Sequence, residues 1–129
     1  MGDAGALEAN KLAVRRFYAE MNRRDVDAIA ELYAADARIF VMAPGAFSGE
    51  LTPSRALTRA FLAAFPELEF EVGAMTAEGD RVAVEAWSRG RRADGTPYRN
   101  HYHNLFVLRA GKVVLLREYT GLEAAAEAR

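Results

Sequence analysis

The sequence contains no cysteine, which excludes disulfide bonds, thiolate nucleophiles and cysteine-ligated metal sites. This absence fits a reducing compartment, and we expect the protein to be cytoplasmic. No apolar run approaches the ~20 residues of a membrane-spanning helix, so we expect no membrane partner. The N-terminus also lacks the charged-then-apolar pattern of a secretory signal.

A strong charge of either sign is missing as well. Lys and Arg number 17 against 18 for Asp and Glu, which leaves a net charge of −1 and no field that would recruit nucleic acid. We find no internal repeat, Gly-rich phosphate loop, Ser-His-Asp order or nucleotide motif, so we expect no cofactor. The 129 residues predict a single domain with its core over 5–121 and an Ala-rich tail, frayed or disordered, over 122–129.

The first half of the chain has helical periodicity. A first helix is predicted over 5–23, because Leu7, Val14, Phe17, Tyr18 and Met21 share one face. Asp25 can cap a second helix that runs through Ile29, Leu32 and Tyr33. A short strand is expected over 37–42. Thr52-Pro53 predicts the start of a third helix, which Pro66 ends.

From Glu67 onward the period of the apolar residues is two. This predicts strands over 68–77, 81–92, 98–109 and 112–120, separated by glycine-containing turns. Three helices followed by hairpin-linked strands predict an α+β fold with a curved, mostly antiparallel sheet packed on three N-terminal helices.

Two segments carry a family resemblance. The run Arg24-Asp25 to Asp36-Ala37, followed by a short strand, a proline and Gly49, resembles the opening of the nuclear transport factor 2-like superfamily. The run Phe106 to Tyr119 resembles its closing hairpin. The match fits the SnoaL-like polyketide cyclase, ketosteroid isomerase and limonene-epoxide hydrolase branch. It implies a cone-shaped barrel with a hydrophobic pocket between sheet and helices, commonly in a homodimer.

Most catalytic residues of ketosteroid isomerases have no counterpart here. The carboxylate base that those enzymes carry at the end of the first strand aligns with Val41. Their oxyanion-hole tyrosine aligns with Phe17, and their protonated aspartate aligns with Asn104. Without a base at Val41, ordinary ketosteroid isomerisation is not expected.

The epoxide-hydrolase set is also incomplete. Its Arg-x-Asp pair falls on Glu85 and Trp87, and its Tyr-x-Asn pair falls on Ile39 and Val41. Of that set, only the carboxylate of the last strand has a counterpart of the same chemical type, which is Glu118.

Two turns decide which side chains share a face with Glu118, because one register step turns every side chain over. A two-residue turn at Asp94-Gly95 would place Trp87 opposite Tyr102. For the last hairpin, a two-residue turn at Ala110-Gly111 places Glu118 opposite His103, whereas a three-residue loop with a left-handed Gly111 places it opposite Tyr102. We favour the second alternative.

These registers predict an apolar cup with a few polar groups, which is typical of a small-molecule site. Its inner face would carry Glu85, Trp87, Arg89, Asn100, Tyr102, Asn104, Phe106, Val114, Leu116, Glu118 and Thr120, closed by Phe17, Ile39, Val41, Phe61 and Phe65. Glu118 is the candidate proton shuttle, because desolvation should raise its pKa toward neutrality. Tyr102, Asn104 and Asn100 could hold developing oxyanion charge. The alternative is a structural pair of Glu118 with Arg89 or Tyr102, and amides that satisfy one another.

His101 and His103 would point away from the pocket, and without a third ligand we predict no metal site. Arg91 and Arg92 are interpreted as a solvated hairpin tip.

The main functional hypothesis is a cofactor-independent enzyme that acts on a small hydrophobic, oxygen-bearing molecule. Its reaction would be a cyclisation, an isomerisation or the opening of an epoxide. The alternatives are a non-catalytic ligand-binding or dimerisation module and an association domain for a partner protein.

Overall fold

The computed structural model describes residues 2–45 and 47–121, so the predicted tail over 122–129 lies outside the described residues. Within them the helices are α1 (Gly2–Arg23), α2 (Val26–Glu31) and α3 (Arg55–Ala64). The strands are β1 (Tyr33–Met42), β2 (Gly49–Leu51), β3 (Glu67–Glu78), β4 (Arg81–Arg91), β5 (Pro97–Arg109) and β6 (Lys112–Tyr119). None of the helices in this part of the chain has the length and apolar character needed to cross a bilayer.

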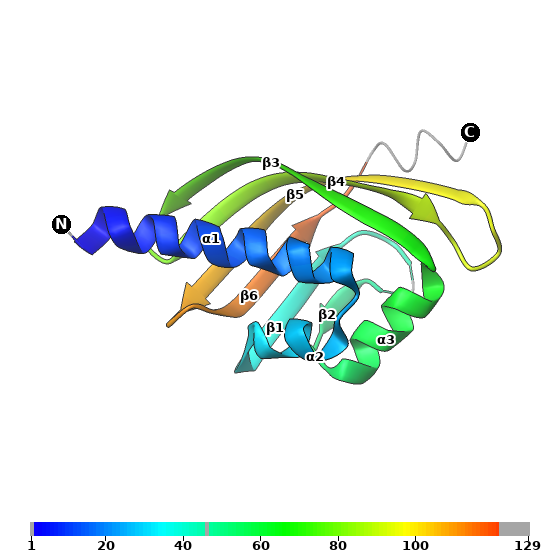
Figure 1. Cartoon of the computed structure of the whole chain (residues 1–129), viewed down its shortest axis with the longest axis horizontal. Coiled ribbons are helices and arrows are strands. Elements are labelled where there is room, and N and C mark those ends of the chain that lie inside the picture. Colours follow the sequence, from blue (N-terminus) through cyan, green and yellow to red (C-terminus); the bar gives the residue numbers. More distant parts are fainter. Residues whose placement is uncertain (1, 46, 122–129) are drawn as a thin grey trace.

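The strands form one curved sheet that arches over the helices (Figure 1). Their order is β2-β1-β6-β5-β4-β3, with β1 and β6 parallel and the other neighbours antiparallel. Helix α1 lies along the concave face of the sheet, and α3 closes one end of the space beneath it (Figure 1). The α+β cone fold is therefore confirmed, with a mixed sheet whose edge strands β2 and β3 leave it unclosed.

Local signals explain where the helices begin. The side chain of Asp25 accepts a hydrogen bond from the Ala28 amide and caps α2 as predicted. Helix α3 is capped by Ser54, whose hydroxyl accepts from the Leu57 amide, and not by Thr52. Tyr33 was expected at the end of the second helix but opens β1, because the chain leaves α2 at Leu32 and pairs with β6.

The predicted pairing of β4 with β5 is wrong by one residue. Arg91 pairs with Pro97, and Ala86, not Trp87, lies opposite Tyr102. The connecting loop has one more residue than predicted: the Gly95 amide donates to the Arg92 carbonyl, and Gly95 adopts a φ of +88°. Such a loop, a tight turn followed by a left-handed glycine, shifts the register and turns every side chain of β4 over.

The last hairpin follows neither of the alternatives in full, because its register places Glu118 opposite Asn104 and not opposite Tyr102 or His103. Ala110 and Gly111 have φ values of +51° and +78° and form a two-residue turn, so the favoured three-residue loop is wrong. A bulge then inserts Val114 into β6, because Leu108 pairs with Val113 while Val107 pairs with Leu115. Val113 is consequently the buried residue, and Glu118 reaches the concave face by way of the bulge.

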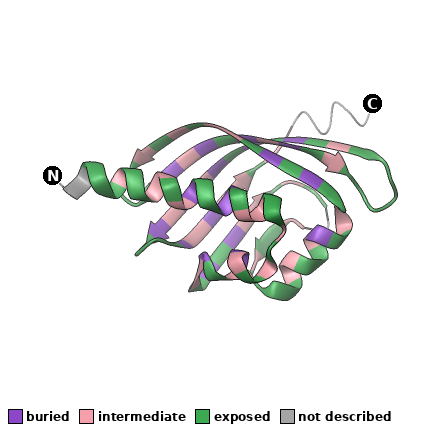
Figure 2. Ribbon diagram, in the orientation of Figure 1, coloured by how far each residue is buried: buried purple, intermediate pink, exposed green. Residues whose placement is uncertain are grey.

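The core lies between α1 and the concave face of the sheet, where buried residues alternate along the strands (Figure 2). Val14, Phe17 and Tyr18 supply the buried face of α1. Phe106, at 0% exposure, packs edge to face on Phe17 with the ring centroids 5.2 Å apart. Leu57 and Phe61 of α3 pack against this core while remaining partly exposed, and they also line the cavity described next.

Candidate active site: a buried carboxyl in an aromatic cavity

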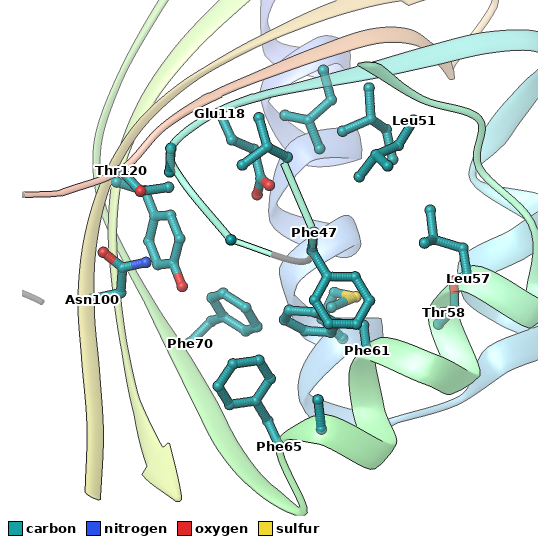
Figure 3. Close-up of a pocket in the computed structure, with 18 of the residues that line it drawn as sticks. Phe47, Leu51, Leu57, Thr58, Phe61, Phe65, Phe70, Asn100, Glu118 and Thr120 are labelled. Carbon is teal, nitrogen blue, oxygen red and sulfur yellow. The ribbon is translucent and has the colours of Figure 1, made fainter. Parts of the chain in front are cut away.

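A cavity of about 1000 Å³ lies between the concave sheet face, α1 and α3 (Figure 3). Aromatic side chains make up much of its wall: Phe17, Tyr18, Tyr33, Phe47, Phe61, Phe65, Phe70, Tyr98 and Tyr102. Aliphatic side chains fill the gaps, among them Ile39, Val41, Leu51, Leu57 and Leu116. An apolar cavity of this size with few polar groups is typical of a small-molecule site.

Glu118 projects its carboxyl group into this cavity (Figure 3). Its position is fixed from two sides: Val41 of β1 pairs with it directly, and the preceding residues of β6 pair with β5. Within residues 2–45 and 47–121, no group donates a hydrogen bond to the carboxyl and no cation pairs with it. Burial raises the pKa of Glu118 from 4.5 to about 7, since the charged form loses its hydration without gaining a partner.

Three phenols share the electrostatic environment of Glu118. Burial raises the pKa values of Tyr18, Tyr33 and Tyr102, and the negative charge of Glu118 adds to the rise in each case. These tyrosines therefore remain protonated at neutral pH and can act as hydrogen-bond donors.

Asn104 orients Tyr18. Its Nδ2 donates to the Tyr18 hydroxyl over 2.9 Å, and its Oδ1 accepts from the Tyr119 amide over 3.2 Å. Because the phenolic oxygen accepts this bond, the hydroxyl proton of Tyr18 remains available to another acceptor. Asn104, at 1% exposure, is buried behind the cavity wall and acts on the cavity through Tyr18.

The side-chain amide of Asn100 also has internal partners. Its Nδ2 donates to the Tyr98 hydroxyl over 2.8 Å. Its Oδ1 accepts from the backbone amides of His101 and Gly121 over 2.8 and 3.2 Å. The Tyr102 hydroxyl shares a hydrogen bond of 2.7 Å with the Ser88 hydroxyl, in which either oxygen can donate. If Ser88 donates, the Tyr102 proton can be directed at a ligand.

The structure brings most of the predicted site residues together around one cavity. Those that line the cavity are Phe17, Ile39, Val41, Phe61, Phe65, Asn100, Tyr102, Leu116, Glu118 and Thr120. Phe106 belongs to the core behind that wall, as does Asn104.

Three predicted ligand-binding residues lie on the face of the sheet opposite to the cavity, so their predicted orientation is wrong. Glu85, Trp87 and Arg89 project from the convex side of the sheet, because the longer β4–β5 loop shifts their register. Trp87 covers Gly73, where an added Cβ would lie 2.6 Å from its ring, and stacks on His101 at 5.1 Å. Arg89 forms an exposed ion pair with Glu69, so the alternative in which it pairs with Glu118 is also wrong.

Sequence reasoning missed many cavity residues, among them Tyr18, Tyr33, Phe47 and Arg92. Tyr18 and Tyr33 were treated only as apolar positions of helices, although a tyrosine hydroxyl in a core requires a partner and is itself a signal. Phe47 and Arg92 lie in connections whose course no periodicity predicts. Arg92 is exposed, as predicted for the hairpin tip, but it also lines the cavity at its hairpin end.

The two histidines lie on the convex face, as predicted. His101 stacks on Trp87, and His103 pairs across the strands with Glu85. Across the described part of the chain, no three His, Asp or Glu side chains gather as metal ligands would.

A family model described as the SnoaL-like domain matches residues 14–116 of this chain. The chain belongs to the SnoaL-like domain family. This places it in the nuclear transport factor 2-like superfamily and confirms the resemblance seen in its sequence. The family match begins within α1 and ends in β6 at Leu116, two residues before Glu118.

Several solved structures resemble this one over nearly its whole length. A putative SnoaL-like polyketide cyclase from Jannaschia sp. CCS1 is 26% identical, with a TM-score of 0.71 over 94% of this chain and 91% of that one. AclR, a putative hydroxylase from Streptomyces galilaeus, is 21% identical, with a TM-score of 0.77 over 95% and 81%. TerC, co-crystallised with polyporic acid, is 21% identical, with a TM-score of 0.75 over 92% and 96%. No curated protein matches the chain significantly.

Proposed function

We propose that this SnoaL-like protein is an acid–base enzyme that acts on a small hydrophobic, oxygen-bearing molecule held in the aromatic cavity. Glu118 transfers the proton in a cofactor-independent cyclisation, isomerisation or epoxide opening. The observation that carries the proposal is a carboxyl group without a protein partner that faces the cavity with its pKa raised to about 7. A group that titrates near neutral pH can both accept and release a proton there.

The developing negative charge on a substrate oxygen needs donors close to Glu118. The phenols of Tyr18 and Tyr102 supply them, because each lines the cavity and stays protonated. Asn104 is a positioning residue in this scheme, since its amide holds the Tyr18 hydroxyl and does not reach the cavity. Asn100 lines the cavity itself and also holds the Tyr98 hydroxyl. The names of the neighbours, a polyketide cyclase and a protein crystallised with polyporic acid, support an oxygenated organic ligand.

The proposal is tested with 5-nitrobenzisoxazole, a small planar molecule whose ring opens when a base removes its C3 proton. The Glu118 carboxylate would take that proton, the N–O bond would break, and the coloured cyanonitrophenolate would leave. We expect saturable turnover that rises with pH and is half-maximal near the Glu118 pKa of about 7. Glu118→Gln should abolish it, whereas Glu85→Gln, which removes an exposed carboxylate from the convex face, should not.

Equal turnover by the wild type and Glu118→Gln would refute the proton-transfer role. Binding without any Glu118-dependent turnover would favour the non-catalytic alternative. The internally bonded amides of Asn100 and Asn104 are the observation that favours that alternative, because each already donates one N–H to a tyrosine hydroxyl of this chain.

We also propose that the protein forms a homodimer through the convex sheet face. Tyr119, which follows Glu118 on β6 and lies on the opposite face of the strand, is a large side chain left 47% exposed there. Sedimentation equilibrium should show a dimer that Tyr119→Lys dissociates. Leu12→Lys, at a 61%-exposed position of α1, should leave it intact. A wild-type monomer at micromolar concentration would refute the proposal.

A further inference from the structure

One cation reaches the cavity described above. Arg92 is the only lysine or arginine among the described residues that line it. It directly follows β4, on the hairpin that extends past the end of α3 (Figure 1). Glu118 projects from β6 elsewhere on the same wall. The cavity wall therefore carries the Glu118 carboxyl, which is anionic or neutral depending on pH, and, at a different place, the permanent positive charge of Arg92.

Arg92 is exposed, but contacts within the hairpin hold its side chain. Its Nη1 donates to the Thr96 hydroxyl over 3.3 Å and to the Pro97 carbonyl over 3.0 Å. Its guanidinium carbon lies 5.1 Å from the centre of the Tyr98 ring, in a cation–π contact. Within the described chain, Nε and Nη2 have no hydrogen-bond partner, and a guanidinium can present two such donors to one anion.

The hairpin that carries Arg92 is fixed to α3. The Ala93 amide donates to the Ala64 carbonyl over 2.9 Å, which satisfies an otherwise unpaired carbonyl at the end of the helix. The Tyr98 ring packs on Phe65 with the centroids 4.5 Å apart, and Phe65 packs on Phe61 at 5.1 Å. These contacts set the distance between the guanidinium and the aromatic wall before any ligand arrives, which lowers the entropy cost of binding.

Asp94 is the carboxylate nearest in sequence and also lines the cavity. Its Oδ1 accepts from both the amide and the hydroxyl of Thr96, over 2.9 and 2.7 Å. These bonds, with a smaller contribution from the Arg92 charge, lower the pKa of Asp94. Asp94 makes no ion pair with Arg92 in the described structure, so the guanidinium is not neutralised by direct contact.

We propose that Arg92 binds an anionic group of the ligand, a carboxylate or an equivalent acid. The ligand of this cavity is then an amphipathic acid. Its apolar body lies against Phe61 and Phe65, its acid group lies at the hairpin, and its oxygen-bearing part extends toward Glu118. This inference names the ligand class of the same site and therefore rests on the cavity being the ligand site of the proposed function.

Two fluorescent probes that differ by one acid group test the inference. 8-Anilinonaphthalene-1-sulfonate carries a sulfonate, and N-phenyl-1-naphthylamine has the same ring system without it. We expect Arg92→Gln to weaken sulfonate binding three- to tenfold, because a partly exposed ion pair contributes on the order of 1 kcal/mol. Binding of the neutral amine should change less than twofold.

Arg91→Gln is the matched control. Arg91 is the preceding residue, donates to the Gly95 carbonyl and lies 3.8 Å from Glu67, but it does not line the cavity. It should leave both affinities unchanged. The two probes should also displace each other, as ligands of one cavity do. Melting temperatures of the variants, measured in the same buffer, show whether each is folded.

The outcomes separate the two claims. If Arg92→Gln weakens both probes equally, or if Arg91→Gln has the same effect as Arg92→Gln, the anion site is refuted. If the probes bind without competing, or if neither binds the wild type, the anion site is also refuted. If binding of the sulfonate probe depends on Arg92 while Glu118→Gln leaves benzisoxazole turnover unchanged, the anion-site proposal stands and the proton-transfer proposal fails.

Discussion

Glu118→Gln should make the protein more stable above neutral pH. In the native state burial raises the pKa of Glu118 from 4.5 to about 7. The unfolded chain therefore releases this proton near pH 4.5, whereas the native protein retains it until about pH 7. Between these values the native state binds more protons, so the free energy of unfolding of the wild type falls as the pH rises.

The magnitude follows from the size of the shift. A rise from 4.5 to about 7 is about 2.5 pH units, and each unit corresponds to ~1.36 kcal/mol. The wild type should lose about 3 kcal/mol between pH 4.5 and pH 7 through this group. Glutamine keeps the shape and cannot ionise, so Glu118→Gln should equal the wild type near pH 4 and exceed it by about 3 kcal/mol at pH 8.5.

Urea unfolding at pH values from 4 to 9 measures this difference directly. The free energy of unfolding of Glu118→Gln minus that of the wild type should rise between pH 4.5 and 7 and then stay constant. Glu85→Gln, which removes an exposed carboxylate, should stay within about 0.5 kcal/mol of the wild type throughout. A difference for Glu118→Gln that is independent of pH would show that its carboxyl is hydrated in the native state.

Four further substitutions test the packing of the fold and the lining of the cavity. Asn104→Ala leaves the Tyr18 hydroxyl and the Tyr119 amide without their partner and should cost about 2–4 kcal/mol in urea unfolding; a cost below 0.5 kcal/mol would contradict the buried network. Gly90→Ala would place a Cβ 1.8 Å from the Glu67 carbonyl oxygen and should lower stability by more than about 2 kcal/mol, whereas Gly5→Ala, with open space around it, should raise the melting temperature slightly. Trp87→Phe should leave the affinity for N-phenyl-1-naphthylamine unchanged in a fluorescence titration, and a large loss would mean that Trp87 reaches the cavity after all.

Much of the fold could be predicted because its signals are local. The helical face of Val14, Phe17 and Tyr18 predicts α1, and the Asp25 side chain caps α2 as its sequence position indicates. The alternating pattern predicts β4, β5 and β6 to within a few residues. These signals depend on neighbours a few positions apart, so they do not require knowledge of the tertiary structure.

The sequence did not predict correctly which side chains of β4 lie on the convex face of the sheet and which lie on the concave face. One extra residue in the loop before Thr96 moves Trp87 and Arg89 from the expected cavity to the opposite face. In the last hairpin a different turn and the bulge at Val114 offset each other, so that Glu118 reaches the cavity by another route than predicted. Side chains alternate with a period of two, and a single inserted residue therefore reverses a whole strand.

The sequence by itself determined the family, the helices and the strands, and the presence of a glutamate near the end of an apolar strand. Only the tertiary structure decided that this carboxyl faces a cavity without a partner, that Asn104 holds Tyr18, and that Arg92 lies at the same wall. These groups come from α1, β5, β6 and the β4–β5 hairpin. They meet only because the sheet curves over the helices, and that curvature depends on bulges and loop conformations that no local pattern specifies.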